Sequence, residues 1–275
     1  MLICIYIEQT LSTLLFLRSL RVTFNCMASM QDSLIKLERA NEHIALFERE
    51  IRSLVDPRSY KVVCNTDKNT GNQTWCFKSP TPIVPLRISA IVGDVLFNLR
   101  SSLDHIVWQL VLTNHCEPTF NNKFPIFISH EFDIKKGNSL KGISSRAIEI
   151  IKECQPKPGH NWELLFLPAL NNTDKHRHLN LAIVYIESAS AVFDTDPPMN
   201  EDIANAFSFN EIKSDAVLFS IPSKYKLRFY IPRFDIGFSE ETNININRPV
   251  LEILKNMSDQ IGRVLSKLAV EVKKE

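Results

Sequence analysis

The chain has 275 residues, of which 44% are hydrophobic and 23% are charged, and its formal net charge is +1. This length is enough for one large domain with a substantial core, and the hydrophobic share excludes an intrinsically disordered chain. A nearly neutral chain gives no support for strong non-specific attraction to nucleic acid or to an anionic membrane, although a local basic patch is compatible with it.

The N-terminal region and the cysteines bear on the compartment. The six cysteines show no C-x-x-C spacing, so they form neither a zinc signature nor a disulfide framework, and we expect a cytoplasmic protein. The apolar run over residues 11–17 is too short to span a membrane and lacks the preceding basic residues of a signal peptide. We interpret residues 1–26 as upstream sequence or a loosely held extension, and we predict a single α+β domain over residues 27–275.

The first predicted elements are a helix and a hairpin. Apolar residues at heptad spacing predict a helix over residues 32–54, and alternating residues around a turn predict a β-hairpin over residues 60–78. If this turn centres on Thr70, Cys64 lies opposite Cys76. In a reducing compartment we interpret this pair as two small buried hydrophobic side chains rather than as a disulfide.

The later elements are predicted from periodicity and from turn residues. They are a long helix over 86–113, a short strand over 124–128, a short helix over 143–154, a helix over 162–184, strands within 185–240 and a last helix after Asn247. We expect Pro168 to kink the helix over 162–184 or to delay its start. The predicted fold class is α+β: a helical bundle with an inserted β-hairpin at about 60–78 and a small antiparallel sheet at about 185–240. We expect the first and last helices to pack against the long one.

The long helix has a polar face that differs from an ordinary solvated face. Between Ile88 and His115 the sequence contains neither Lys nor Glu. At about 100° per residue, one narrow stripe holds Arg87, Asp94, Asn98, Ser101 and His105, with Trp108 beside it. Asn, Asp, Ser and His are middling helix formers and are poor choices for a face that only meets water.

A second polar cluster lies in the helix predicted over 162–184. It contains Asp174, Lys175, His176, Arg177 and His178. Asp174 and His178 are spaced i,i+4 on an apolar helix face, where each needs a partner. Arg100 is the natural partner for Asp174, and Asn98 or Asp94 for His178. The two clusters are either halves of one functional site or parts of one buried polar network, and the sequence leaves both interpretations open.

Arg100 and His105 form an R-x4-H pattern. A histidine exchanges protons at neutral pH and an arginine stabilises charge on a phosphate, so together they could cleave RNA without a metal. A five-residue offset separates the side chains by about 140° on a regular helix, so they converge only across a dimer interface or through a kink. The alternative is that Arg100 pairs with Asp104 at i,i+4 and that His105 belongs to a structural network.

We expect neither a metal nor an organic cofactor. Asp94, His105, Asp174 and His178 are suitable metal ligands by type, which keeps a metal-dependent hydrolase as a minor hypothesis, but no spacing specifies such a site. The sequence contains no G-x-G-x-x-G and no Walker loop for a nucleotide.

The R-x4-H pattern in a long helix of a predicted bundle resembles the HEPN-like superfamily. The resemblance covers one helix closely and the bundle loosely. It implies a metal-independent endoribonuclease of a toxin–antitoxin or phage-defence system, acting as a homodimer whose paired helices form one RNA-cleaving cleft. His105 would be the acid/base, Arg100 the phosphate ligand, and Asn98 and Asp104 orienting residues.

Two features depart from that superfamily. The residue after the arginine is Ser101, where the superfamily usually has a polar residue and often Asn, Asp or His, and β segments are inserted into the bundle. The wider pattern of Gly93-Asp94, the stretch over 98–105 and the Asp174-Lys175-His176-Arg177 run also resembles a group of uncharacterised bacterial proteins.

Two functional hypotheses result from these patterns. The first is a HEPN-like endoribonuclease or toxin/defence effector that takes RNA as substrate, forms a homodimer, has an antitoxin or defence partner and does not bind a membrane. The second is a non-catalytic binding or scaffold protein whose Arg, Asp and His side chains form a structural polar network.

Overall fold

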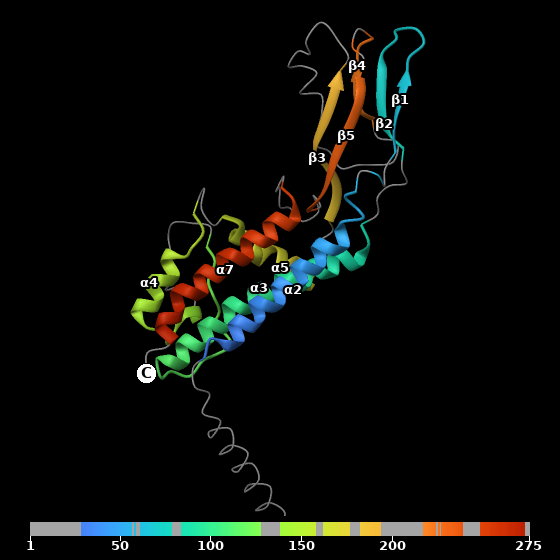
Figure 1. The fold of residues 1–275 in the computed structure, drawn as a ribbon. Helices are drawn as coiled ribbons and strands as arrows, with labels where there is room; N and C mark the ends of the chain where they lie inside the picture. The colour runs from blue at the N-terminus through green and yellow to red at the C-terminus, as the bar shows by residue number, and fades with distance from the viewer. Residues whose placement is uncertain are drawn as a thin grey trace, which may run out of the picture.

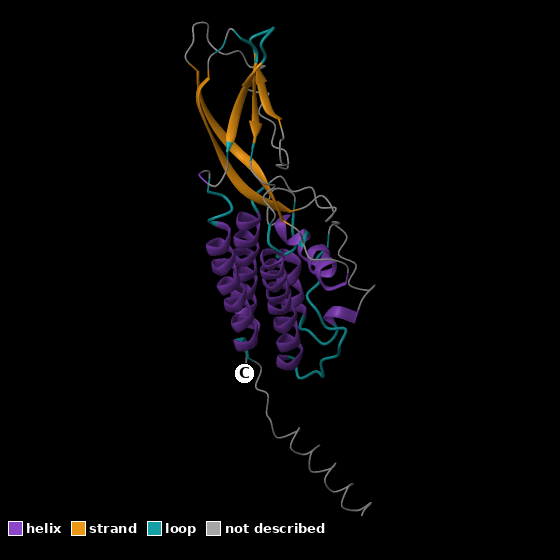
Figure 2. Ribbon diagram, turned by 90° about the vertical axis from the view of Figure 1, so that its right-hand side faces the viewer, coloured by secondary structure: helices purple, strands orange, loops and turns teal. Residues whose placement is uncertain are grey.

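The computed structural model describes residues 29–56, 58, 61–78, 84–127, 138–157, 162–176, 182–193, 217–223, 225, 227–238 and 248–272. The segment predicted as an extension, residues 1–26, lies outside the described residues. The protein is an α+β protein in which a body of helices is joined to strands that extend from one end of it (Figures 1 and 2).

Three long helices form the centre of the helical body. They are α2 (Gln31–Ile51), α3 (Leu86–Thr113) and α7 (Val250–Val272). Helix α2 packs along α3, and α7 lies against both, which confirms the expectation that the first and last helices pack on the long one (Figure 1). The apolar stripe of α3 is buried as its 3.6-residue period predicts, with Val92, Val95, Leu99 and Leu103 all at 0% exposure.

Shorter helical segments flank this centre. They are η3 (Asn138–Leu140), α4 (Ser145–Glu153), η4 (Trp162–Leu165) and α5 (Leu167–His176). The Ser144 side chain caps α4 by accepting a hydrogen bond from the Ala147 N–H at 3.2 Å. Pro168 lies in the first turn of α5, where its missing N–H costs nothing, so the delayed start is the correct alternative.

Two antiparallel sheets account for the strands. Strands β1 (Val62–Thr66), β2 (Gln73–Phe77) and β4 (Val217–Ile221) form one sheet in the order β1-β2-β4. Strands β3 (Ala182–Phe193) and β5 (Leu227–Phe238) form the other. The hairpin and the later strands are therefore confirmed, but the hairpin shares its sheet with β4.

Three local predictions were wrong. The helix predicted over 162–184 ends at His176, and residues 182–184 start β3, where pairing with β5 outweighs helical periodicity. Phe124 belongs to no strand, because side chains rather than a neighbouring strand bind its backbone. Cys64 lies opposite Trp75 instead of Cys76, because the turn centres half a residue earlier and shifts the register by one.

The large apolar core lies among the helices, and a smaller one lies in the sheet. The small core contains Phe219, Ile221 and Tyr225, with Trp75 stacked on Phe219 at 6.0 Å between ring centroids. Within the described part of the chain, no helix has the length and apolar character needed to cross a membrane.

Candidate functional site

Arg100 and Asp104 together bind the backbone of one residue outside their helix. Arg100 donates hydrogen bonds from Nε and Nη2 to the two carboxylate oxygens of Asp104, at 3.0 and 2.7 Å. The same Nη2 donates to the Phe124 carbonyl at 2.7 Å, and Asp104 Oδ1 accepts from the Phe124 N–H at 2.8 Å. The pair therefore replaces a strand partner for Phe124, a residue of the core that is 1% exposed.

This geometry is the i,i+4 pairing of the structural alternative. The Arg100 side chain is 13% exposed and that of Asp104 is 34% exposed. Asp174, the partner expected for Arg100, lies elsewhere. Because the Arg100 guanidinium already donates to Asp104 and Phe124, it has fewer N–H groups left to donate to a phosphate. The negative charge of Asp104 also repels an incoming anion.

The two sequence clusters meet at a different point, between Gly93 of α3 and Asp174 of α5. A Cβ atom added to Gly93 would lie 2.4 Å from Asp174 Oδ1 and 2.7 Å from Oδ2. Because glycine has no Cβ, the carboxylate lies directly against the α3 backbone, which accounts for a glycine inside a long helix. Gly93 is thus the residue that allows the two clusters to approach.

The Asp174 carboxylate is poorly compensated where it lies. Its Oδ1 atom is buried and has no hydrogen-bond partner among the described residues. The same holds for Ser89 Oγ and Asn171 Oδ1. Burial raises the pKa of Asp174, the negative charge of Asp94 raises it further, and Lys175 opposes both. This junction is therefore a polar network with unmet hydrogen-bonding capacity.

An aromatic ring lies beside this junction. Phe97 is 43% exposed, and its ring centroid is 5.4 Å from the Lys36 ammonium and 5.0 Å from that of Lys175. Asn98 accepts a long hydrogen bond of 3.5 Å from Lys36 and donates to the Asp94 carbonyl at 2.8 Å, so Asn98 is part of the network. Sequence reasoning missed Phe97 and Lys36, although an aromatic residue opposite the apolar stripe of α3 was a readable signal.

His105 does not meet Arg100 within the chain. Its side chain is half-buried, and no described residue forms a hydrogen bond with it. It shares an exposed face of α3 with Phe97, Ser101 and the 41%-exposed Trp108. Arg100, in contrast, faces Phe124, as the angular offset predicts for a regular helix.

The remaining predicted site residues are only partly described. His176 is the last residue of α5, and Arg177 and His178 lie outside the described residues, so the expected partners of His178 stay a prediction. Among the residues that the structure describes, no three His, Cys, Asp or Glu side chains are grouped so that they could hold a metal ion.

A buried carboxylate that the sequence did not predict anchors η4 to α7. Glu163 is 5% exposed and accepts hydrogen bonds from Arg248 at 2.9 Å, Asn256 at 3.2 Å and Gln260 at 2.7 Å. Burial raises the pKa of Glu163, but hydrogen bonds from its own backbone, Gln260, Arg248 and Asn256 outweigh burial, and the net pKa lies below 4.5. Because these bonds tie η4 to α7 and to the residue just before α7, Glu163 is a structural anchor.

Comparisons with known proteins add no relative to this picture. No family model matches the chain, and the curated proteins and the solved structures compared with it give no significant match.

The contact between Gly93 and Asp174 can be tested with a double-mutant cycle. Gly→Ala inside a helix ordinarily stabilises by about 1 kcal/mol, but here the new methyl group displaces a carboxylate. We expect Gly93→Ala to lower the free energy of unfolding by about 1 kcal/mol in the wild type and to raise it by about 1 kcal/mol in an Asp174→Ala background. Urea unfolding of the four proteins measures this coupling, and additive effects would contradict the contact.

Proposed function

We propose that the helical body is a non-catalytic binding or scaffold unit whose Arg, Asp and Asn side chains hold its helices and connecting segments in place. The observation that carries this proposal is the commitment of Arg100 and Asp104 to the Phe124 backbone. A phosphate-binding arginine needs free donors at an open surface, whereas this one is 13% exposed and already paired.

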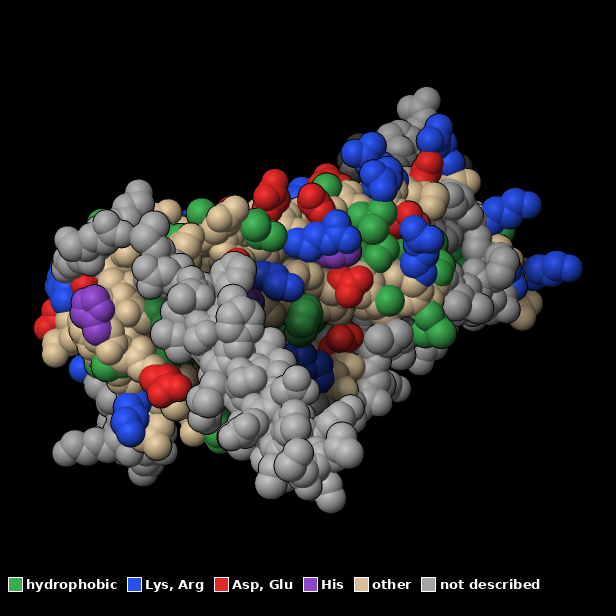
Figure 3. Space-filling view, turned by 90° about the horizontal axis from the view of Figure 1, so that it is seen from below, with side chains coloured by type: hydrophobic (Ala, Val, Ile, Leu, Met, Phe, Trp, Pro, Cys, Tyr) green, Lys and Arg blue, Asp and Glu red, His purple; other side chains and the backbone are tan. Residues whose placement is uncertain are grey.

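The charge distribution supports the same proposal. On the described part of the face drawn in Figure 3, acidic side chains lie among the basic ones. An RNA-cleaving cleft needs an excess of positive charge along the path of the phosphates. The two lysines at Phe97 are instead accompanied by Asp94 and Asp174.

The second candidate is the HEPN-like endoribonuclease, with RNA as substrate, a homodimer as the active form and an antitoxin or defence partner. One observation favours it: His105 lies on a face of α3 that also exposes Phe97 and Trp108, and two aromatic rings suit base stacking. This candidate requires Arg100 to leave Asp104 or to act from its paired position.

Expression of wild type, His105→Ala and Arg100→Ala in cells distinguishes the two candidates. For a scaffold we expect total RNA to stay intact in all three cultures, His105→Ala to melt close to wild type, and Arg100→Ala to melt lower. Growth arrest with RNA fragmentation in the wild type, abolished by His105→Ala in a folded protein, would establish the nuclease and reject the scaffold.

A further inference from the structure

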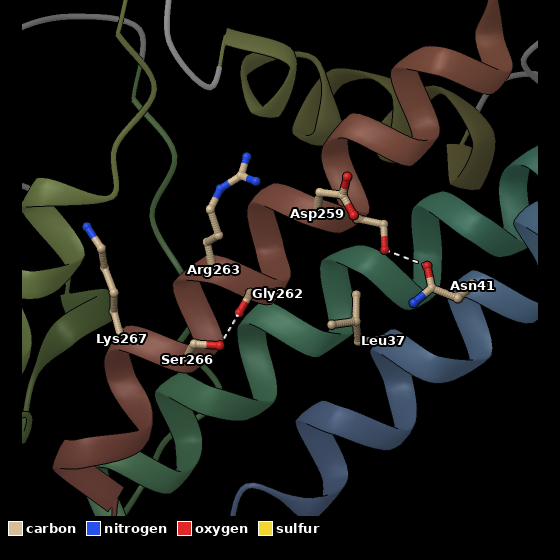
Figure 4. A pocket seen from close by; sticks show the side chains of 8 residues that line it. Leu37, Asn41, Asp259, Gly262, Arg263, Ser266 and Lys267 are labelled. Atoms are coloured by element: carbon tan, nitrogen blue, oxygen red, sulfur yellow. Dashed lines mark hydrogen bonds between the residues drawn. The ribbon is translucent and has the colours of Figure 1, made fainter.

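An open groove runs between α2 and α7, away from the polar network of α3 and α5 (Figure 4). Its volume is about 510 Å³. Leu37 and Asn41 of α2 form one wall, and Ser258, Gly262 and Ser266 form the other. The three α7 residues are four positions apart, so small side chains follow one another along one face of that helix and leave the space open.

The groove is closed at one end and apolar at the other. Lys255 and Glu48 form an ion pair of 2.8 Å between the two helices, about one turn beyond Ser258 on α7 and about two turns beyond Asn41 on α2. Toward the other end Leu34 is 49% exposed and Val270 is 59% exposed, one turn beyond Leu37 and Ser266 respectively. Large apolar side chains left in water beside an unfilled groove mark a surface that gains free energy when covered.

Unpaired charges of opposite sign lie on the two edges of this surface. Glu38 is exposed on the α2 edge, and the α7 edge carries Arg263 together with Asp259 and Lys267. Neither Glu38 nor Arg263 forms an ion pair with a described residue. A Cβ added to Gly262 would lie 3.8 Å from Leu37, so the two helices meet there. Glu38 follows Leu37 and Arg263 follows Gly262 in the chain, so these two charged residues lie at nearly the same position along the length of the groove.

We propose that this surface binds a second copy of the same chain, through a two-fold axis that runs along the groove. Rotation about that axis leaves the position of every residue along the groove unchanged and exchanges the two edges. Glu38 of each copy therefore faces Arg263 of the other, which gives two such pairs. With a two-fold axis across the groove, the α2 edge of one copy would face the α2 edge of the other, and the α7 edges would face each other. Like charges would then lie together. The charge pattern is thus self-complementary for one axis, as an isologous interface requires.

This inference goes beyond the proposed function and does not depend on it. It also differs from the dimer of the nuclease hypothesis, in which α3 helices pair. Leu37 in the groove and the exposed side chains of Leu34 and Val270 at its end supply an apolar centre for the interface. The two Glu38–Arg263 pairs supply its polar rim, which is the usual division in protein interfaces.

A charge-swap series tests the proposal on the full chain. Sedimentation equilibrium gives the dimer dissociation constant of wild type, Glu38→Arg, Arg263→Glu and the double variant. We expect each single reversal to raise the dissociation constant about tenfold or more and the double variant to recover most of that loss. Arg146→Glu, a reversal of an exposed arginine on α4, is the matched control and should leave the dissociation constant unchanged.

A second variant tests the groove itself. Gly262→Leu fills the space that the second copy would use, and we expect it to give a monomer with wild-type helicity. A wild type that is monomeric at all concentrations overturns the proposal, and so does a dimer indifferent to all of these changes. If residues 258–270 are protected from hydrogen exchange in a monomer, and that protection is lost when residues 1–28 are deleted, the occupant is that segment and the proposal is wrong.

Discussion

Glu163→Gln is expected to lower the free energy of unfolding by about 2–3 kcal/mol. The substitution keeps the shape of the side chain but removes the charge that accepts hydrogen bonds from Arg248, Asn256 and Gln260. Hydrogen bonds to a buried charged group are worth more than neutral ones, and an amide nitrogen placed among three donors leaves at least one of them without an acceptor. Urea unfolding monitored by circular dichroism measures the change.

The control for this substitution is the same change at a second glutamate that pairs with Arg248. Glu252 also pairs with Arg248, but its side chain is 49% exposed, so Glu252→Gln should cost less than about 1 kcal/mol. An equal cost for the two substitutions would show that burial of Glu163 contributes nothing.

The same carboxylate has a signature in the pH dependence of stability. Because the folded state holds the pKa of Glu163 below its ordinary value of 4.5, the unfolded state binds the proton more tightly. The charged Glu163 side chain therefore contributes its full stabilisation at pH values above 4.5, the pKa of the unfolded state. This contribution is lost as the pH falls through the lower pKa of the folded state. On acidification from about pH 5, Glu163→Gln should lose less stability than the wild type.

Local periodicity was enough to predict the helices, and it failed where distant pairing decides the structure. The apolar stripe of α3 repeats at helical spacing and is buried as expected. Residues 182–184 continue an apolar pattern that a helix could use, but they pair with residues 236–238 of β5, and no local signal reveals that partner. The one-residue error at Cys64 has the same origin, since hairpin register depends on the geometry of the turn.

The polar network was predictable only over short distances along the chain. The Arg100–Asp104 pair lies within one helical turn, so the sequence offers it as an alternative. Its third member, the Phe124 backbone, is 20 residues away from Asp104 and carries no side-chain signal. Glu163 was missed for the same reason, because Asn256 and Gln260 of α7 and Arg248 just before that helix come late in the chain.

The approach of Asp174 to Gly93 shows what the sequence did contain. A glycine inside a helix without a turn or a positive φ needs a packing explanation, and a close approach of another group is the usual one. The sequence therefore marked the position of the contact, while the identity of the approaching side chain required the fold.

Arg100→Ala tests the interpretation on which the proposed function depends. Removal of the guanidinium leaves the Phe124 carbonyl without its donor and the Asp104 carboxylate without its counter-charge. The segment after α3 then keeps only the hydrogen bond from the Phe124 N–H to Asp104. Breaking one member of a largely buried pair is costly because the other stays behind unpaired. We expect a loss of about 2–4 kcal/mol in the free energy of unfolding.

The comparison that decides the role of Arg100 is with Arg146→Ala. Arg146 pairs with Glu149 within one helix, as Arg100 pairs with Asp104, but both side chains are about 60% exposed, so its removal should cost less than about 0.5 kcal/mol. Proteolysis should further show earlier cleavage near Phe124 in Arg100→Ala than in Arg146→Ala, because the segment is released locally before the helices unfold. If the two variants are equally stable and are cut at equal rates, the guanidinium of Arg100 is free for another task, and the nuclease hypothesis gains the residue that it needs.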